Sequence, residues 1–168
     1  MRIDSLATHE AAHGFMAERL GATVTDMSIV PDAISAGHIN YRHAGRPSLP
    51  GSPKALRHEM RVQCMVSLAG PAAEALFSRE LIWTVIERNP VDLRDARRAA
   101  VAFALARPTW TADAHRDVFR ELLIEVRELL EANWSIVIKL AETLQMRKTM
   151  TSAEVVRTLH FAQKRQAA

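Results

Sequence analysis

The chain carries His9-Glu10-Ala11-Ala12-His13 close to its N-terminus, and the interpretation of the rest depends on this pentapeptide. On an α-helix, residues four apart lie on one face, so both imidazoles can reach a single metal ion. The glutamate beside the first histidine reaches the open position of that metal. The spacing therefore predicts a zinc site with an activated water. The simpler alternative is two ordinary helix histidines with a salt-bridging glutamate.

The composition predicts one soluble domain of ordinary size. Of the 168 residues, 48% are apolar and 24% are charged, which is enough to build one core. No apolar run approaches the about eighteen residues of a membrane helix, and the polar N-terminus is unlike a secretory signal. We expect a cytoplasmic protein without a membrane segment. Its single domain, 1–168, should hold the metal site in 1–110 and C-terminal helices in 111–168.

Charge and cysteine content argue against a nucleic-acid partner and against a metal site built from cysteines. The formal net charge is +3, but basic and acidic side chains are interleaved, and no aromatic and basic residues alternate as a stacking platform requires. We therefore expect no nucleic-acid partner. The single cysteine, Cys64, disfavours a thiolate zinc site. Any metal should be held by histidine and carboxylate.

Apolar side chains recur with the helical period along most of the chain. The segments with this pattern are 4–21, 54–77, 89–106, 112–146 and 151 onward. Asn89 should cap the third segment, because Pro90 follows it at the first helical position. We expect a kink or break at Gly70-Pro71 and a further break near Asn133.

The remaining segments predict strands and connections. Ala22 to Pro31 and Ala36 to Tyr41 are short apolar runs that predict a pair of strands. Residues 43–53, with two glycines and three prolines, predict a loop, and 78–88 are assigned to a connection. The fold class is therefore mainly α (α+β), with a small two- or three-stranded β element after the motif helix.

A third metal ligand is needed, because a catalytic zinc site usually has three protein ligands and a water. The five other histidines follow no ligand spacing, and a surface or packing role is the simpler interpretation. Asp92 and Asp95 lie three apart on a helix face that also carries apolar side chains, where a carboxylate needs a partner. Spacing leaves both open, since an acid in the first helical turn also stabilises unpaired N–H groups.

Beyond the motif, the sequence resembles the FtsH family of ATP-dependent zinc metalloproteases. The similar segments are HEAAHGFMAERLG (9–21), SIVPDAISAG (28–37), LAGPAAE (68–74) and VDL (91–93). The family has Asn-Asp-Leu where VDL falls, so the resemblance implies Asp92, rather than Asp95, as the third ligand. Glu74 matches an acid in the family's GGRAAE segment and would orient a ligating histidine. The alternative for Glu74 is a helix-surface acid near Arg79.

The chain also departs from the family pattern. Pro71 replaces an arginine, Ala12 replaces the glycine inside the motif, and Gly14 replaces an alanine. The sequence contains no P-loop lysine and no ATPase module. The resemblance therefore implies an FtsH-like peptidase domain without its own ATPase. Family members are hexamers, which implies a homo-oligomer, although ring contacts also depend on the missing module.

The resemblance further implies how a polypeptide substrate would bind. An extended peptide would pair with the backbone of the second predicted strand, at Ala36, Gly37, His38 and Ile39. The first functional hypothesis is thus a zinc endopeptidase of unfolded or small proteins, acting alone or with a separate unfoldase, with Glu10 activating the water. The second is a catalytically silent binding or regulatory module. A purely structural zinc domain is disfavoured by the lack of a fourth protein ligand.

Overall fold

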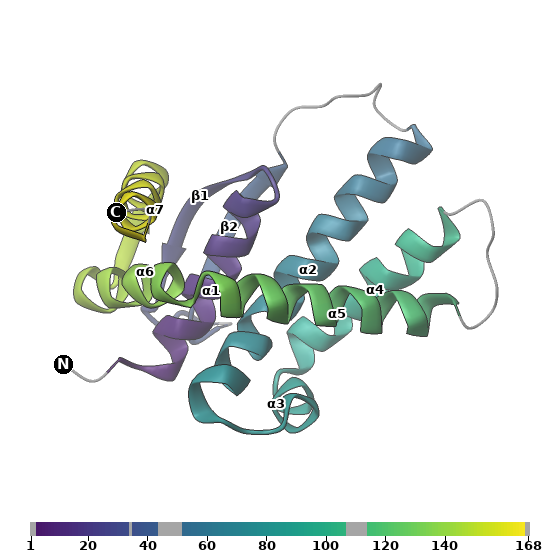
Figure 1. The fold of residues 1–168 in the computed structure, drawn as a ribbon, viewed down its shortest axis with the longest axis horizontal. Coiled ribbons are helices and arrows are strands. Elements are labelled where there is room, and N and C mark those ends of the chain that lie inside the picture. Colours follow the sequence, from purple (N-terminus) through teal and green to yellow (C-terminus); the bar gives the residue numbers. More distant parts are fainter. Residues whose placement is uncertain (1–2, 34, 44–51, 107–113, 167–168) are drawn as a thin grey trace.

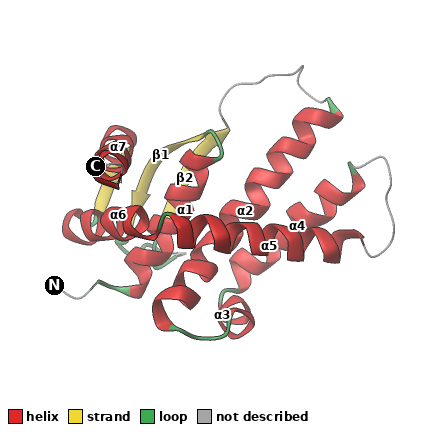
Figure 2. Cartoon of the chain, viewed as in Figure 1, coloured by secondary structure: helices red, strands yellow, loops and turns green. Residues whose placement is uncertain are grey.

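The computed structural model describes residues 3–33, 35–43, 52–106 and 114–166, and it has a mainly α fold with one small sheet (Figures 1 and 2). The elements are α1 (Ser5–Arg19), β1 (Ala22–Ser28), β2 (His38–His43), α2 (Pro53–Ser78), α3 (Ile82–Arg88), α4 (Pro90–Leu105), α5 (Ala114–Ala132), α6 (Trp134–Arg147), β3 (Thr149–Thr151) and α7 (Ser152–Gln166). The predicted fold class is confirmed at this level. No helix in these ranges is long and apolar enough to cross a membrane.

Helix α1 lies in the interior of the fold. Every residue from Ala7 to Ala17 is buried, so the helix has no solvent-facing side over three turns. It packs against α2 and α6 and against strand β1. The Asp4 side chain caps its start by accepting a hydrogen bond from the Leu6 N–H at 3.1 Å. Gly21 follows with a φ of +80°, as expected for a glycine that ends a helix.

The three strands form an antiparallel sheet in the order β2-β1-β3. The predicted pair is present with shifted bounds, since β1 ends at Ser28 rather than Pro31 and β2 begins at His38 rather than Ala36. The third strand comes from the C-terminal third of the chain, where Met150 pairs with Met27. Strand β2 therefore lies at one edge of the sheet.

Helix α2 is continuous from Pro53 to Ser78, so of the kink or break expected at Gly70-Pro71 the break is wrong. Pro71 lacks the N–H that would bind the Ser67 carbonyl, which removes a single helical hydrogen bond. Contacts with α1, α4 and α5 hold the helix on several sides and outweigh that loss. The connection assigned to 78–88 is also partly wrong, because α3 forms there around the buried Val85 and Ile86.

Asn89 precedes α4 as predicted, but its side chain does not cap that helix. The Asn89 amide instead donates hydrogen bonds to Glu74 Oε2 at 3.0 Å and to the Val85 carbonyl at 2.9 Å. The predicted break at Asn133 is confirmed between α5 and α6. Residues 44–51 of the predicted loop, and the expected helix start at 112, lie outside the described residues.

We predict that Leu140→Ala destabilises the fold around the motif helix. Leu140 of α6 is fully buried, and a Cβ placed on Gly14 of α1 would lie 3.7 Å from it. Removing this side chain should lower the free energy of unfolding by about 2–5 kcal/mol. Urea unfolding followed by circular dichroism measures the effect.

The matched control is Leu105→Ala at the end of α4, where the side chain is 57% exposed. This substitution should change the free energy of unfolding by no more than about 0.5 kcal/mol. Equal losses in the two variants would contradict the packing described for α6 against α1.

Candidate metal centre

His9 and His13, from the middle of α1, and Asp92, from the first turn of α4, bring their ligand atoms together at one point. The His9 Nε2 atom lies 3.0 Å from His13 Nε2 and 3.1 Å from Asp92 Oδ2. The His13 Nε2 atom lies 3.6 Å from Asp92 Oδ1. With metal bonds of about 2.1 Å, tetrahedral zinc ligands lie about 3.4 Å apart. The three side chains thus fit around one ion after small shifts, and a fourth position remains for water.

The three candidate ligands restrict which metal ions can bind but do not identify one. Two imidazoles and one carboxylate form catalytic zinc sites, and the same donors also hold ferrous iron in other proteins. Asp95, the alternative ligand, also faces the site cavity, but its carboxylate pairs with Arg94 at 2.9 Å. The geometry therefore favours Asp92 over Asp95, as the resemblance implies.

Gly70 lets the backbone of α2 lie directly against the two histidine rings. A Cβ on this residue would lie 2.5 Å from His9 Nε2 and at a clashing distance from His13 Nε2. Those nitrogens are the atoms that would bind the metal, so any side chain at this position displaces them. From the sequence, Gly70 was expected at a kink or break of the helix, and no contact with the histidines was predicted for it. Its position in the LAGPAAE segment was the available signal.

A second contact with α2 fixes the orientation of the His13 ring. The His13 Nδ1 atom lies 2.6 Å from the Val66 carbonyl oxygen. A carbonyl can only accept a hydrogen bond, so Nδ1 carries the proton and donates it. The Nε2 atom is then unprotonated and faces the metal position.

Glu74 makes the corresponding contact with His9. Its Oε2 atom lies 3.4 Å from His9 Nδ1 and accepts the hydrogen bond from Asn89, and Ser5 donates to Oε1 at 3.4 Å. Within the described ranges no ion pair joins Glu74 to Arg79. The structure thus brings Glu74 to the histidine that the resemblance implies, and its role there stays a prediction.

Glu10 is buried beside the metal ligands and lies against the start of β2. A Cβ on Gly37 would lie 2.9 Å from Glu10 Oε1, so the backbone there passes directly over the carboxylate. No group in the described part of the chain donates a hydrogen bond to Glu10. Burial raises the pKa of Glu10 to about 7, although His9 opposes the shift. A carboxylate with this pKa can both accept and return a proton near neutral pH.

The site opens into a cavity of about 460 Å³. Its walls include the three metal ligands and Glu10, together with Gly37, His38 and Ile39 from the β2 side. Ala36 lines an adjoining cavity of about 420 Å³ that also reaches Glu10 and Glu74. All four residues predicted to contact substrate therefore lie along the openings to the site, and His38 and Ile39 belong to the edge strand.

The metal-free site has an uneven charge distribution. Burial lowers the pKa of His9, but hydrogen bonds with Asp92 and Glu74 and the charges of Asp92 and Glu10 outweigh it and raise the pKa to about 9. Burial, together with the charge of His9, lowers the pKa of His13 to about 4. Near neutral pH, His9 is therefore charged and paired with Asp92, while His13 is neutral. A metal ion would replace the His9 proton at Nε2.

Comparisons with models of protein families find no match to this chain, and no curated protein matches it. The resemblance at the motif segments therefore stays a hypothesis. The candidate metal centre rests on the geometry of the three ligands and on the polar contacts that orient them.

We predict that Gly70→Ala strongly weakens metal binding, because the new methyl group displaces both ligating nitrogens. Loss of metal affinity should exceed the about 10- to 100-fold typical of removing one orienting contact. Titration of the metal-free protein with zinc against a competing chelator measures this.

Gly14→Ala is the control, since it makes the same change one residue after His13. Its Cβ would meet the end of the flexible Met27 side chain at 3.1 Å and Leu140 at an ordinary contact distance of 3.7 Å, and neither residue is a candidate ligand. Unchanged zinc affinity in Gly70→Ala would refute the close approach of α2 to the histidines.

We also predict a pH dependence for the stability of the metal-free protein. The folded-state pKa of His9 is raised from 6.5 to about 9, so its stabilising contribution is complete below pH 6.5 and is lost as the pH rises towards 9. The raised pKa of Glu10 likewise makes the folded protein less stable as the pH rises from about 4.5 to 7. Urea unfolding in the presence of a chelator at pH 6.5, 7.5 and 9 should show falling stability.

His9→Gln should reduce the loss of stability between pH 6.5 and 9, because the titrating imidazole is absent. Parallel curves for the variant and the unchanged protein would show that His9 does not carry the effect.

Proposed function

We propose that this protein is a zinc-dependent endopeptidase that hydrolyses peptide bonds of unfolded or small proteins. The observation that carries the proposal is the position of Glu10, buried beside a group of three metal ligands and facing the same cavity. A histidine pair, a carboxylate and an adjacent glutamate form the donor set and base that metal-assisted hydrolysis requires.

Each side chain has a definite part in this reaction. Bound zinc would polarise the substrate carbonyl and lower the pKa of a water molecule towards neutrality. Glu10 accepts the proton of the attacking water on its carboxylate and then donates it to the leaving amine. The Val66 carbonyl and Glu74 keep the histidine rings in the tautomers that expose Nε2.

Strand β2 offers the surface for the substrate. It lies at the edge of the sheet, and His38 and Ile39 line the cavity at the same time. An extended peptide can pair with such an edge through its backbone, which places a peptide bond near the ligands without regard to sequence. This mode requires an unfolded segment. A separate unfoldase, or assembly of several copies of the chain, would supply such segments from folded proteins.

We predict that Glu10→Gln abolishes cleavage of an unfolded protein such as casein while leaving zinc content nearly unchanged. Glutamine has similar shape but cannot accept the proton, and general-base catalysis contributes roughly 100- to 10,000-fold. Cleavage is followed with a fluorescent casein substrate, and zinc is measured by atomic emission after purification without chelator.

Two further variants test the metal assignment in the same assay. Asp92→Ala should lose both zinc and activity, whereas Asp95→Ala should keep its zinc. Equal activity of Glu10→Gln and the unchanged protein would refute the mechanism. Normal zinc content with no cleavage of any unfolded protein would favour the silent binding module instead.

A further inference from the structure

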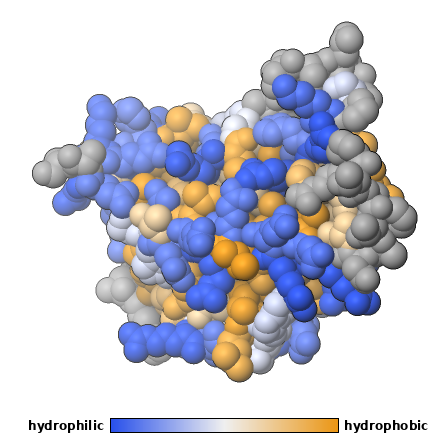
Figure 3. All heavy atoms as spheres, turned by 45° about the vertical axis from the view of Figure 1, so that its right-hand side comes forward, coloured by the Kyte–Doolittle hydropathy of each residue, from blue (hydrophilic) through white to orange (hydrophobic). Residues whose placement is uncertain are grey.

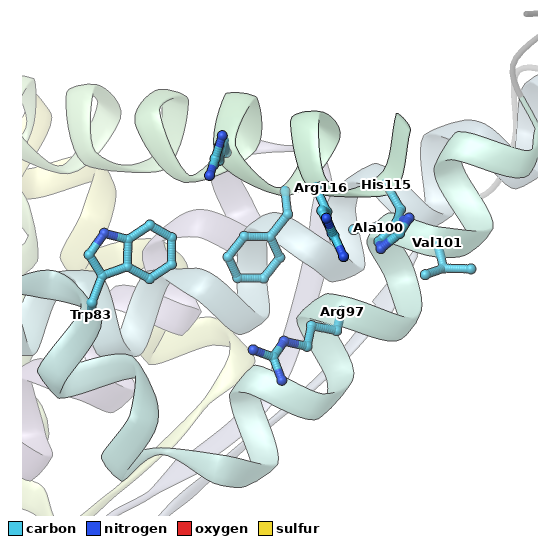
Figure 4. A pocket seen from close by; sticks show the side chains of 8 residues that line it. Trp83, Arg97, Ala100, Val101, His115 and Arg116 are labelled. Carbon is cyan, nitrogen blue, oxygen red and sulfur yellow. The ribbon is translucent and has the colours of Figure 1, made fainter. Parts of the chain in front are cut away.

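A second cavity lies away from the metal centre, between α3, α4 and α5 (Figure 4). Its volume is about 490 Å³, within the range of small-molecule sites. Arg97 comes from α4, and Arg116 and Arg120 come from successive turns of α5. None of its described lining residues also lines the metal-site cavity.

One wall of the cavity is aromatic. Trp83 of α3 and Phe119 of α5 stack with ring centroids 6.4 Å apart and an angle of 21° between the ring planes. Phe119 is buried, but Trp83 is 51% exposed. Figure 4 shows Trp83 on one side of the cavity and Arg116 and His115 on the other. An indole face is therefore available beside the basic groups.

The charge of the cavity is one-sided. Among the residues that the structure describes, three arginines and one histidine line it, and none of the lining side chains is acidic. Arg97 and Arg120 form no ion pair with any of the described residues. Several guanidinium groups around one cavity repel each other and create a positive potential, which a dianion relieves better than a monoanion. Guanidinium groups also match the oxygen geometry of phosphate through paired hydrogen bonds.

We propose that this cavity binds a nucleoside phosphate. The base stacks on the exposed face of Trp83, and the phosphate lies among Arg97, Arg116 and Arg120. The sequence alone gave no sign of this site, because its aromatic and basic residues do not alternate along the chain. They come together only when α3, α4 and α5 pack. On the face of the molecule that Figure 3 shows, hydrophilic and hydrophobic residues are mixed.

The cavity and the metal centre meet only through α4. Arg97 follows Asp92 by five residues, which places the two side chains about 140° apart around the helix axis. The proposal is therefore independent of the peptidase assignment, and either can fail without the other.

Calorimetric titration of the full chain with AMP, adenosine and inorganic phosphate tests the proposal. AMP should bind at least tenfold more tightly than adenosine or phosphate alone, because only AMP contacts both the aromatic side chains and the arginines. Trp83→Leu should weaken AMP binding about five- to a hundredfold, the range for a lost base–aromatic stack. Trp83→Phe should retain more affinity than Trp83→Leu.

Arg97→Gln should weaken binding of both AMP and phosphate about tenfold or more, since it removes a charged hydrogen-bond donor. The matched control is Arg98→Gln, an exposed arginine on the same helix that does not line the cavity. Asp92→Ala should bind AMP normally, which separates this site from the metal centre.

Four results would overturn the proposal, and the first three concern AMP. These are no AMP binding at millimolar concentration, unchanged binding in both Trp83→Leu and Arg97→Gln, and loss of binding in Asp92→Ala. Much tighter binding of a single-stranded oligonucleotide than of AMP would also overturn it, because the occupant would then be a nucleic-acid strand.

Discussion

The crossing of α1 and α2 at Gly70 is the contact on which the candidate metal centre depends. Val66, Gly70 and Glu74 are spaced by four residues, so they lie on one side of α2. Val66 contacts the ring of His13, Glu74 contacts the ring of His9, and Gly70 passes between them without a side chain. His9 and His13 are also four residues apart, so one side of α2 can orient both histidines of α1.

Asn89 connects this crossing to the third ligand. Its amide joins the carboxylate of Glu74 on α2 to the Val85 carbonyl at the end of α3. Since α4 begins at the next residue, these two hydrogen bonds set where Asp92 enters the site. The group that orients His9 therefore also helps to position Asp92, and a change at Glu74 should disturb two metal ligands together.

Sequence patterns predicted the long elements well, because their apolar periodicity reports burial directly. Helix α3 and strand β3 were missed or misplaced because seven and three residues are too short to show a period. The motif placed His9, Glu10 and His13 on one helix, whereas Asp92 needed the resemblance, since spacing alone could not exclude Asp95. The LAGPAAE segment marked Gly70, but its contact with the two histidine rings was not predictable, because a close approach of two helices depends on how they pack.

The β1–β3 pairing has a consequence for how the protein is made. Ribosomal synthesis delivers α1 before α6, which packs against it, and before β3, which pairs with β1. Both partners follow α1 by more than a hundred residues. A helix buried along three turns cannot stay packed without those partners. The three candidate metal ligands should therefore stay unassembled until α6 and β3 have also left the exit tunnel.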